Sequence, residues 1–180
     1  MSQLKVNSIV PVGGLPTGAT GGGIIQTVYA SKDDGVSISY SGNNVDTGLS
    51  ATINMQSASN KLLIICSPLW SSNGNIGYLM LTDGSNNIIQ RPDANNSRGR
   101  YHWGTHYNGS NAGDNRYHTA RETFHCVHTP GSAGNFTVKL RAYVTNSGSY
   151  YVYLNRNWYD GDRINDPIGI STLTLYEISG

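Results

Sequence analysis

The sequence predicts an all-β protein, and three observations support this fold class. Short runs of alternating apolar and polar residues are separated by clusters of Gly, Asn, Ser, Asp and Pro. Charged residues make up only 13% of the chain, and Asn, Ser, Thr and Gly carry most of its polarity. That composition suits turns and polar strand faces and is poor for helices. No stretch has the apolar period of an amphipathic helix.

The chain divides into an N-terminal arm with a Gly-rich linker, residues 1–23, and a β domain, residues 24–180. The arm opens with an alternating run from Leu4 to Val10, which predicts one β-strand. Prolines and glycines follow up to the Gly21–Gly23 triplet and end regular structure. Because a lone strand leaves half its backbone hydrogen-bonding groups unpaired, we expect it to dock on its own chain, a sister chain or a larger partner.

In the first half of the domain, alternation or an apolar run between turn signals indicates each strand. Lys61–Trp70 is the most apolar segment and is the expected central strand. Asp83-Gly84 is a hairpin signal between two further strands, whereas the polar stretch Ser41–Gly48 predicts a loop. The predicted strands are 24–32, 36–40, 49–55, 61–70, 76–82 and 87–91.

The second half contains the clearest period-two stretch, from Phe136 to Thr145. Pro130-Gly131 precedes it, and Asn146-Ser147-Gly148 turns the chain after it. The predicted strands are 100–107, 117–128, 136–145, 150–158 and 170–178. Short strands at this spacing, with no internal repeat, predict a sandwich or barrel, of which the eight-stranded jelly roll is one form.

Charge and hydropathy argue against several partners. The formal net charge of +1 gives no general attraction to nucleic acid or to an acidic membrane. The longest apolar run is far shorter than the roughly 18 residues of a membrane span, and the leader lacks the features of a secretion signal. We therefore expect no membrane and no nucleic-acid partner. Cys66 and Cys126, two cysteines in apolar runs, are expected to be buried reduced thiols.

Four segments together resemble a known family. The leader SQLKVNSIVPVGGL is similar to the N-terminus of many structural proteins of tailed phages, especially marine cyanobacterial ones (cyanophages). The last strand, ISTLTLYEI from Ile170, resembles the final strand of phage fibre-type domains. NKLLIICS from Asn60 and IGYLMLTDG from Ile76 resemble the two central strands of that domain, which is a trimeric jelly roll like the complement globular head and tumour necrosis factor.

The resemblance implies a non-enzymatic virion structural protein that forms a homotrimer and is anchored by its N-terminus. The expected location is the virion, after assembly in the host cytoplasm, and the expected partners are copies of itself and other virion proteins of head, neck or tail. About twenty residues separate anchor from head, which implies a short appendage, either tail fibre-like or a capsid decoration. The arm would add a strand to an exposed sheet edge, and the anchoring residues would be Leu4, Val6, Ile9 and Val10.

The histidines and aspartates give weak metal signals. His102 and His106 share a face of a strand, but they lie roughly 13 Å apart at about 3.3 Å per residue, too far for one zinc ion. The Asp160-Gly161-Asp162 stretch with Asp166 lacks the terminal Glu and the spacing of a calcium loop. A trimer axis could gather three copies of one histidine, which the sequence leaves open. We predict no metal site and no cofactor.

Two alternatives to a purely structural role remain open. The protein could recognise a host surface glycan, because basic and aromatic residues follow one another in RGRYHWGTHY from Arg98; the same pattern is also common in a core or subunit interface. The candidate contacts are Arg100, Tyr101, Trp103, Tyr107, Trp158 and Tyr159. A polysaccharide-degrading enzyme is the third reading, although no nucleophile motif or paired carboxylates support it.

Overall fold

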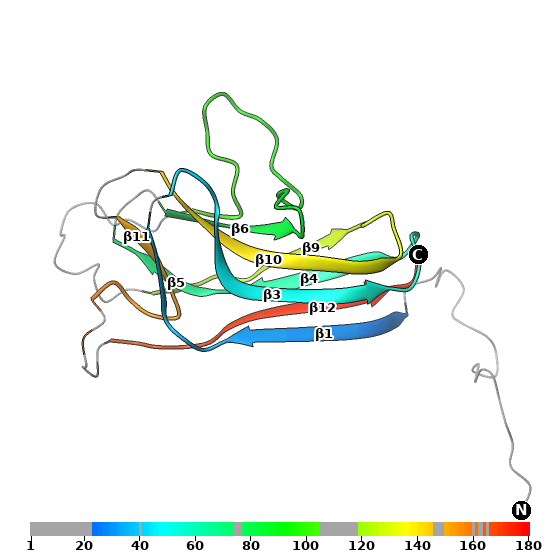
Figure 1. Ribbon diagram of the computed structural model, residues 1–180, viewed down its shortest axis with the longest axis horizontal. Helices are drawn as coiled ribbons and strands as arrows, with labels where there is room; N and C mark the ends of the chain where they lie inside the picture. Colours follow the sequence, from blue (N-terminus) through cyan, green and yellow to red (C-terminus); the bar gives the residue numbers. More distant parts are fainter. Residues whose placement is uncertain are drawn as a thin grey trace, which may run out of the picture.

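The computed structural model describes residues 23–39, 41–73, 77–104, 119–145, 150–159, 161, 164 and 166–180. Over these residues the protein is all-β, as the sequence predicts, with antiparallel strands and no helix (Figure 1). The strands are β1 (Ile24–Lys32), β2 (Val36–Ser39), β3 (Val45–Met55), β4 (Lys61–Ser67), β5 (Leu69–Ser72), β6 (Gly77–Asp83), β7 (Trp103–Gly104), β8 (Ala120–Arg121), β9 (Phe124–His128), β10 (Gly134–Val144), β11 (Tyr151–Leu154) and β12 (Ser171–Ile178).

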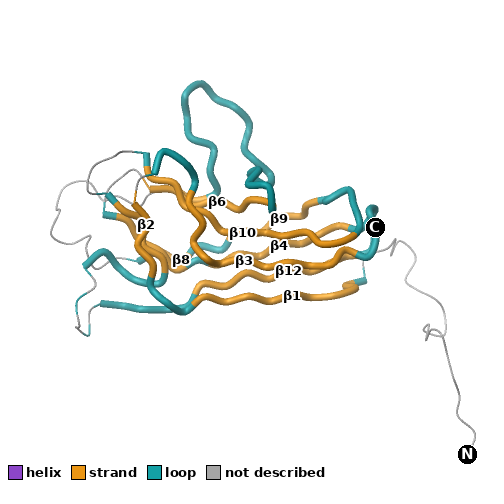
Figure 2. The backbone as a smooth tube through the Cα atoms, viewed as in Figure 1, coloured by secondary structure: helices purple, strands orange, loops and turns teal. Residues whose placement is uncertain are grey.

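The described strands form three four-stranded sheets (Figure 2). Sheet 1 has the order β1-β12-β4-β9, sheet 2 has the order β3-β10-β6-β7, and a smaller end sheet has the order β2-β11-β5-β8. Sheets 1 and 2 enclose the hydrophobic core between them, an arrangement consistent with a β-sandwich. Strands from opposite ends of the chain are neighbours, because β1 pairs with β12 and β3 pairs with β10.

Alternation along the strands builds the core. In β10 the buried residues Val138, Leu140 and Ala142 alternate with half-buried Lys139 and Arg141, as the period-two pattern predicts. β4 is an interior strand between β12 and β9, which confirms the expected central strand. The core-facing residues of these sheets include Leu49, Ile53, Leu62, Ile64, Leu173 and Leu175.

Several predicted strand boundaries are wrong: the predicted strand 117–128 contains both β8 and β9, and the predicted strand 150–158 ends at Leu154. Three others are wrong for local chemical reasons. The apolar run 61–70 is split into β4 and β5 at Pro68, which has no backbone N–H to donate to a ladder. β3 begins at Val45, inside the expected loop 41–48. The predicted strand 87–91 makes only the bridge between Thr82 and Ile88, because Asp83 caps the turn at Ser85 and Asn87 and Gln90 takes a positive φ of 47°.

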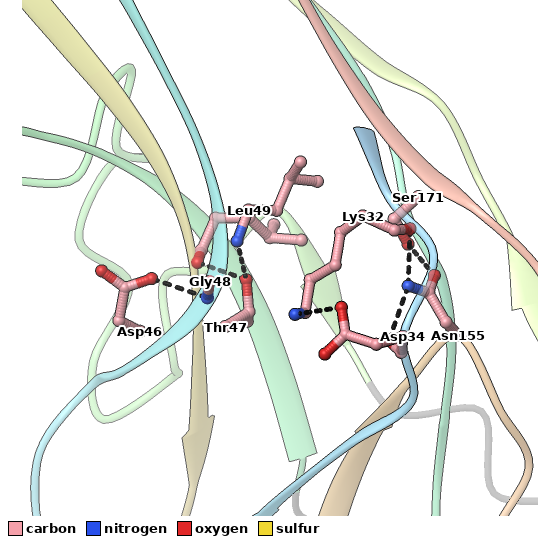
Figure 3. Close-up of polar contacts among 9 residues, drawn as sticks. Lys32, Asp34, Asp46, Thr47, Gly48, Leu49, Asn155 and Ser171 are labelled. Carbon is pink, nitrogen blue, oxygen red and sulfur yellow. Dashed lines mark hydrogen bonds and ion pairs between the residues drawn. The ribbon is translucent and has the colours of Figure 1, made fainter. Parts of the chain in front are cut away.

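The early start of β3 includes an irregularity opposite Leu140. The pairing register with β10 shifts there, so that residues 47–49 face Leu140. Gly48 adopts φ 83°, a conformation that favours glycine. The Thr47 hydroxyl donates to the Leu140 carbonyl at 2.7 Å and accepts from the Leu49 amide at 3.3 Å, and Asp46 accepts from the Gly48 amide at 2.9 Å (Figure 3).

Asn155 ties the end sheet to sheet 1. It is fully buried and left-handed, with φ 62°. Its side-chain Nδ2 donates to the carbonyl oxygens of Lys32 and Asp34 at 2.7 and 3.1 Å, and its Oδ1 accepts from the Ser171 hydroxyl at 2.6 Å (Figure 3). Its own backbone amide donates to the Leu69 carbonyl at 2.7 Å. One side chain therefore joins the β1–β2 connection to the start of β12.

The two cysteines lie on neighbouring strands, Cys66 on β4 and Cys126 on β9. Both are buried and free, which confirms the predicted reduced thiols. Burial raises the pKa of each thiol, so both remain protonated and unreactive at neutral pH.

Candidate interaction surfaces

Both ends of the described chain meet at one end of the sandwich. The Ser179 amide donates to the Gly23 carbonyl at 3.1 Å, and Figure 1 shows the start of β1 and the C-terminus at this side of the body. The predicted anchoring residues lie outside the described residues. They are Leu4, Val6, Ile9 and Val10.

At this end a buried carboxylate accepts hydrogen bonds from separate segments of the chain. Glu177 lies on β12 and is fully buried. Its carboxylate accepts from the Asn60 side chain at 2.6 Å, the Gln26 side chain at 2.5 Å and the Gln56 amide at 2.7 Å. Desolvation alone would raise the pKa of Glu177, but these hydrogen bonds and one from the Ser57 backbone outweigh it and lower the pKa. The ionised carboxylate thus joins β1, β12 and the connection from β3 to β4.

The aromatic segment before β7 points three consecutive side chains in three directions. Tyr101 stacks on Tyr78 and Tyr143, outer-face residues of sheet 2, with ring centroids 4.4 and 5.7 Å away. Burial, followed by the neighbouring phenols of Tyr143 and Tyr78, raises the pKa of Tyr101. His102 bonds to backbone groups at the edge of β6, and Trp103 enters the core.

Trp103 is a core residue, and its burial argues against the expected glycan contact. It is 3% exposed, its Nε1 donates to the Glu122 carbonyl at 3.0 Å, and its ring packs edge-on against Phe124. A ring buried in this way has no open face on which a sugar could stack. Arg100 and Tyr101 are half-buried, and Tyr107 lies outside the described residues.

The segment that follows β11 lies at the end of the sandwich away from the start of β1 and the C-terminus (Figure 1), and it carries Trp158 and Tyr159. They are 39% and 41% exposed, and Ile168 and Ile170 on the same segment are also exposed. Asn157, next to Trp158, is buried and donates to Asp166 at 2.8 Å. The structure therefore separates these two candidate contacts from Trp103 in both environment and chain segment.

The outer faces of the two main sheets differ in chemistry. On sheet 1, Tyr176 of β12 pairs with Leu63 of β4, and Leu63 pairs with Val127 of β9, so an apolar row crosses three strands. Val127 is 46% exposed, and Tyr29, on the same face of β1, is 61% exposed. On sheet 2 the part of the outer face formed by β3 and β10 is polar, with residues Ser50, Thr52, Asn54, Thr137, Lys139 and Arg141, whereas Tyr78 and Tyr143 lie further along this face and carry the stacked Tyr101.

The described residues contain no group of three His, Cys, Asp or Glu side chains that could hold a metal ion. His106, Asp160 and Asp162, which entered the metal hypotheses, lie outside this part of the chain. His125 is exposed, whereas His128 is half-buried and stacks on Phe136, as expected for residues three apart on a strand.

Sequence reasoning missed the roles of Glu177, Asn155 and His102. For Glu177 a signal was present, because the alternation of β12 places it on the same face as Leu173 and Leu175. A carboxylate at a core position needs several donors. No local pattern marks Asn155 or His102, since their partners come from segments distant in sequence or from backbone groups.

No protein-family model and no curated protein sequence matches this chain. Within the described ranges there is also no helix with the length and apolar character needed to span a membrane.

Proposed function

We propose that this protein is a non-enzymatic structural component of a bacteriophage particle, a short homotrimeric appendage that an N-terminal arm attaches to the virion. The leader and strand segments that resemble phage structural proteins support the phage assignment. The apolar outer face of sheet 1 is the observation that carries the assembly part of the proposal.

The strand order supports the jelly-roll topology that we propose for the head. Apart from the end sheet, the strands in chain order are β1, β3, β4, β6, β7, β9, β10 and β12. The first pairs with the last, the second with the seventh, the third with the sixth and the fourth with the fifth, all antiparallel. This is the pairing of one long hairpin rolled into two sheets, which supports the eight-stranded jelly roll.

The outer face of sheet 1 supports self-association. An antiparallel sheet that faces water normally shows polar and charged residues there, as the β3–β10 part of sheet 2 does. Tyr29, Leu63, Tyr176 and Val127 place aromatic and aliphatic groups across the face, among uncharged polar residues that include Thr27, Thr172 and Thr174. No carboxylate lies among the outward residues of these four strands, and Lys61 is their one formally charged group. Stable homo-oligomer interfaces have this composition.

The meeting of the termini supports the arm as an attachment device. The Ser179 amide donates to the Gly23 carbonyl at one end, whereas the segment that follows β11, which carries the exposed Trp158 and Tyr159, lies at the other (Figure 1). An arm docked on the particle would hold the first end near the virion and direct the second outward. Three arms in one trimer would strengthen the attachment through effective concentration.

Charge placed on sheet 1 tests the assembly proposal. We expect Val127→Glu combined with Tyr29→Glu to be monomeric by light scattering at a concentration at which the wild type is trimeric. Both side chains are exposed in the single chain, so the fold tolerates the change, whereas unpaired charges buried in an interface are costly.

Ser50→Glu combined with Asn54→Glu is the matched control, because it places the same two charges on the outer face of sheet 2, where both residues are exposed. It should keep the wild-type mass. A double variant of sheet 1 that assembles as the wild type does would contradict the proposed face. Normal incorporation into particles of a chain that lacks residues 1–23 would contradict the anchoring role of the arm.

A further inference from the structure

Between β6 and β7 the chain leaves the edge of sheet 2 and later returns to it. The Ile89 amide donates to the Leu81 carbonyl at 3.0 Å just before the chain departs, and the His102 amide donates to the Leu79 carbonyl at 3.2 Å as it returns. We call residues 90–101 the excursion; all of residues 91–99 are exposed. Figure 1 shows it in green, standing away from the body.

One imidazole closes the base of the excursion. His102 Nδ1 accepts from the Leu81 amide at 3.0 Å, and its Nε2 lies 2.8 Å from the Ile89 carbonyl oxygen. Because the Leu81 N–H is a donor, Nδ1 must carry a lone pair, which puts the single ring proton on Nε2. The Leu81 amide has no strand partner where the chain departs, and the ring accepts its hydrogen bond. The same ring also bonds to the Ile89 carbonyl and so links Leu81 to Ile89.

We propose that His102 is a pH-sensitive clasp that holds the excursion to the edge of β6 when neutral and releases it when protonated. The proposal does not depend on the phage assignment or on the oligomeric state. A proton on Nδ1 would face the Leu81 N–H, so a hydrogen bond would become a contact between two donors, one of them charged. The protonated ring is therefore stable only after the base has opened.

Among the described residues, burial and the backbone of Ile89 and Gln90 act on the pKa of His102, and no carboxylate does. His102 packs on Phe124 and Trp103, with ring centroids 4.4 and 5.8 Å away. Both ring nitrogens are taken by backbone groups, and Asp83 acts on His128 instead. The titratable and charged groups of the surrounding elements are Asp83 of β6, Arg91 and Tyr101 of the excursion, Glu122, and Cys126 and His128 of β9.

The direction of the pH effect follows from burial. Desolvation lowers the pKa of His102, although the carbonyls of Ile89 and Gln90 act in the opposite direction. The open form, with a solvated imidazole, therefore binds a proton more tightly than the closed form. The closed form is favoured above about pH 6.5, the usual pKa of histidine, and loses its advantage as the pH falls below that value.

Amide hydrogen exchange on the full-length protein tests the clasp. Below about pH 6.5, and until the pKa of the closed form is reached, we expect the protection factor of the Leu81 amide to fall by up to about tenfold per pH unit. The Met80 amide is the internal reference. Successive residues of a strand direct their backbone amides to opposite edges, and the Met80 amide is directed to β10. Its protection should stay constant.

Histidine variants separate this clasp from other titrations. In His102→Gln the protection factor of the Leu81 amide should be independent of pH. In His128→Gln it should keep the wild-type pH dependence, although burial also lowers the pKa of His128. If His102→Gln does not fold, nitrogen chemical shifts of the wild-type ring still decide the matter. The proposal is overturned if Leu81 protection is independent of pH, if it falls together with that of Met80, or if the neutral ring carries its proton on Nδ1.

Discussion

Asn155 joins three segments through a side chain that adds nothing to the hydrophobic core. Its amide group is surrounded by the Lys32 and Asp34 carbonyls and the Ser171 hydroxyl, and Ser171 in turn accepts from the Leu69 amide at 2.9 Å. The backbone conformation is also selective, because left-handed φ disfavours most residues other than glycine and asparagine. Asparagine meets both requirements at once.

We expect Asn155→Ala to lower the free energy of unfolding by about 2–4 kcal/mol, because buried carbonyls lose their donor and alanine is strained at positive φ. Asn96→Ala is the control, since Asn96 is also left-handed, with φ 51°, but is exposed; it should cost about 1–2 kcal/mol. Urea denaturation of both variants measures the difference. Equal losses would mean that the Asn155 side chain contributes nothing beyond its backbone conformation.

At this scale the sequence predicts core residues well and buried polar residues poorly. Val138 and Leu140 follow from alternation alone, because burial in a strand has period two. Trp103 was predicted as an aromatic residue on a strand, but whether its ring faces core or solvent depends on the position of β7 beside β6. Asn155 and His102 depend on partners that local sequence does not reveal.

At the scale of elements, the strand breaks come from backbone chemistry and the ties between strands from polar side chains. Pro68 separates β4 from β5, and both Gly48 and the Thr47 hydroxyl accommodate the irregularity in β3. Pro68 was visible in the sequence as a residue that cannot donate to a ladder. The irregularity was not, because it is defined by the register of β3 against β10, which is distant in sequence.

The buried Glu177 carboxylate and its hydrogen bonds predict that the free energy of unfolding depends on pH. Hydrogen bonds keep the folded pKa of Glu177 below its unfolded value, so its contribution is present above the unfolded pKa, about 4.3, and is lost as the pH falls through the folded pKa. We expect the urea midpoint of the wild type to fall in this acidic range. Glu177→Gln should have a lower midpoint at pH 7, because an amide cannot replace the carboxylate as acceptor of all these bonds.

Glu122→Gln is the control for this effect, since Glu122 is the only other glutamate and is exposed. The variant should keep the wild-type midpoint at pH 7 and the wild-type loss in acid. If Glu177→Gln showed the same loss of midpoint between pH 7 and pH 4 as the wild type, the acid sensitivity would belong to other groups.

At the scale of the whole molecule, the body has two chemically different faces and two different ends. The outer face of sheet 1 has an apolar row across three strands, whereas the β3–β10 part of sheet 2 presents polar and charged residues. At one end Gly23 is hydrogen-bonded to Ser179, and at the other lies the segment that follows β11, which carries the exposed Trp158 and Tyr159. The all-β class was predictable from composition and alternation. The asymmetry between the faces was not, because it depends on which strands share a sheet.

Solution mass tests the central claim, that the β domain assembles as a trimer through its own surface and leaves the arm free for attachment. Light scattering of the full chain should give three times 19.4 kDa, about 58 kDa, and residues 24–180 should likewise give three times their own chain mass. A full chain that remains monomeric would contradict the claim. A trimer that becomes a monomer when residues 1–23 are removed would place the subunit contact in the arm and not in sheet 1.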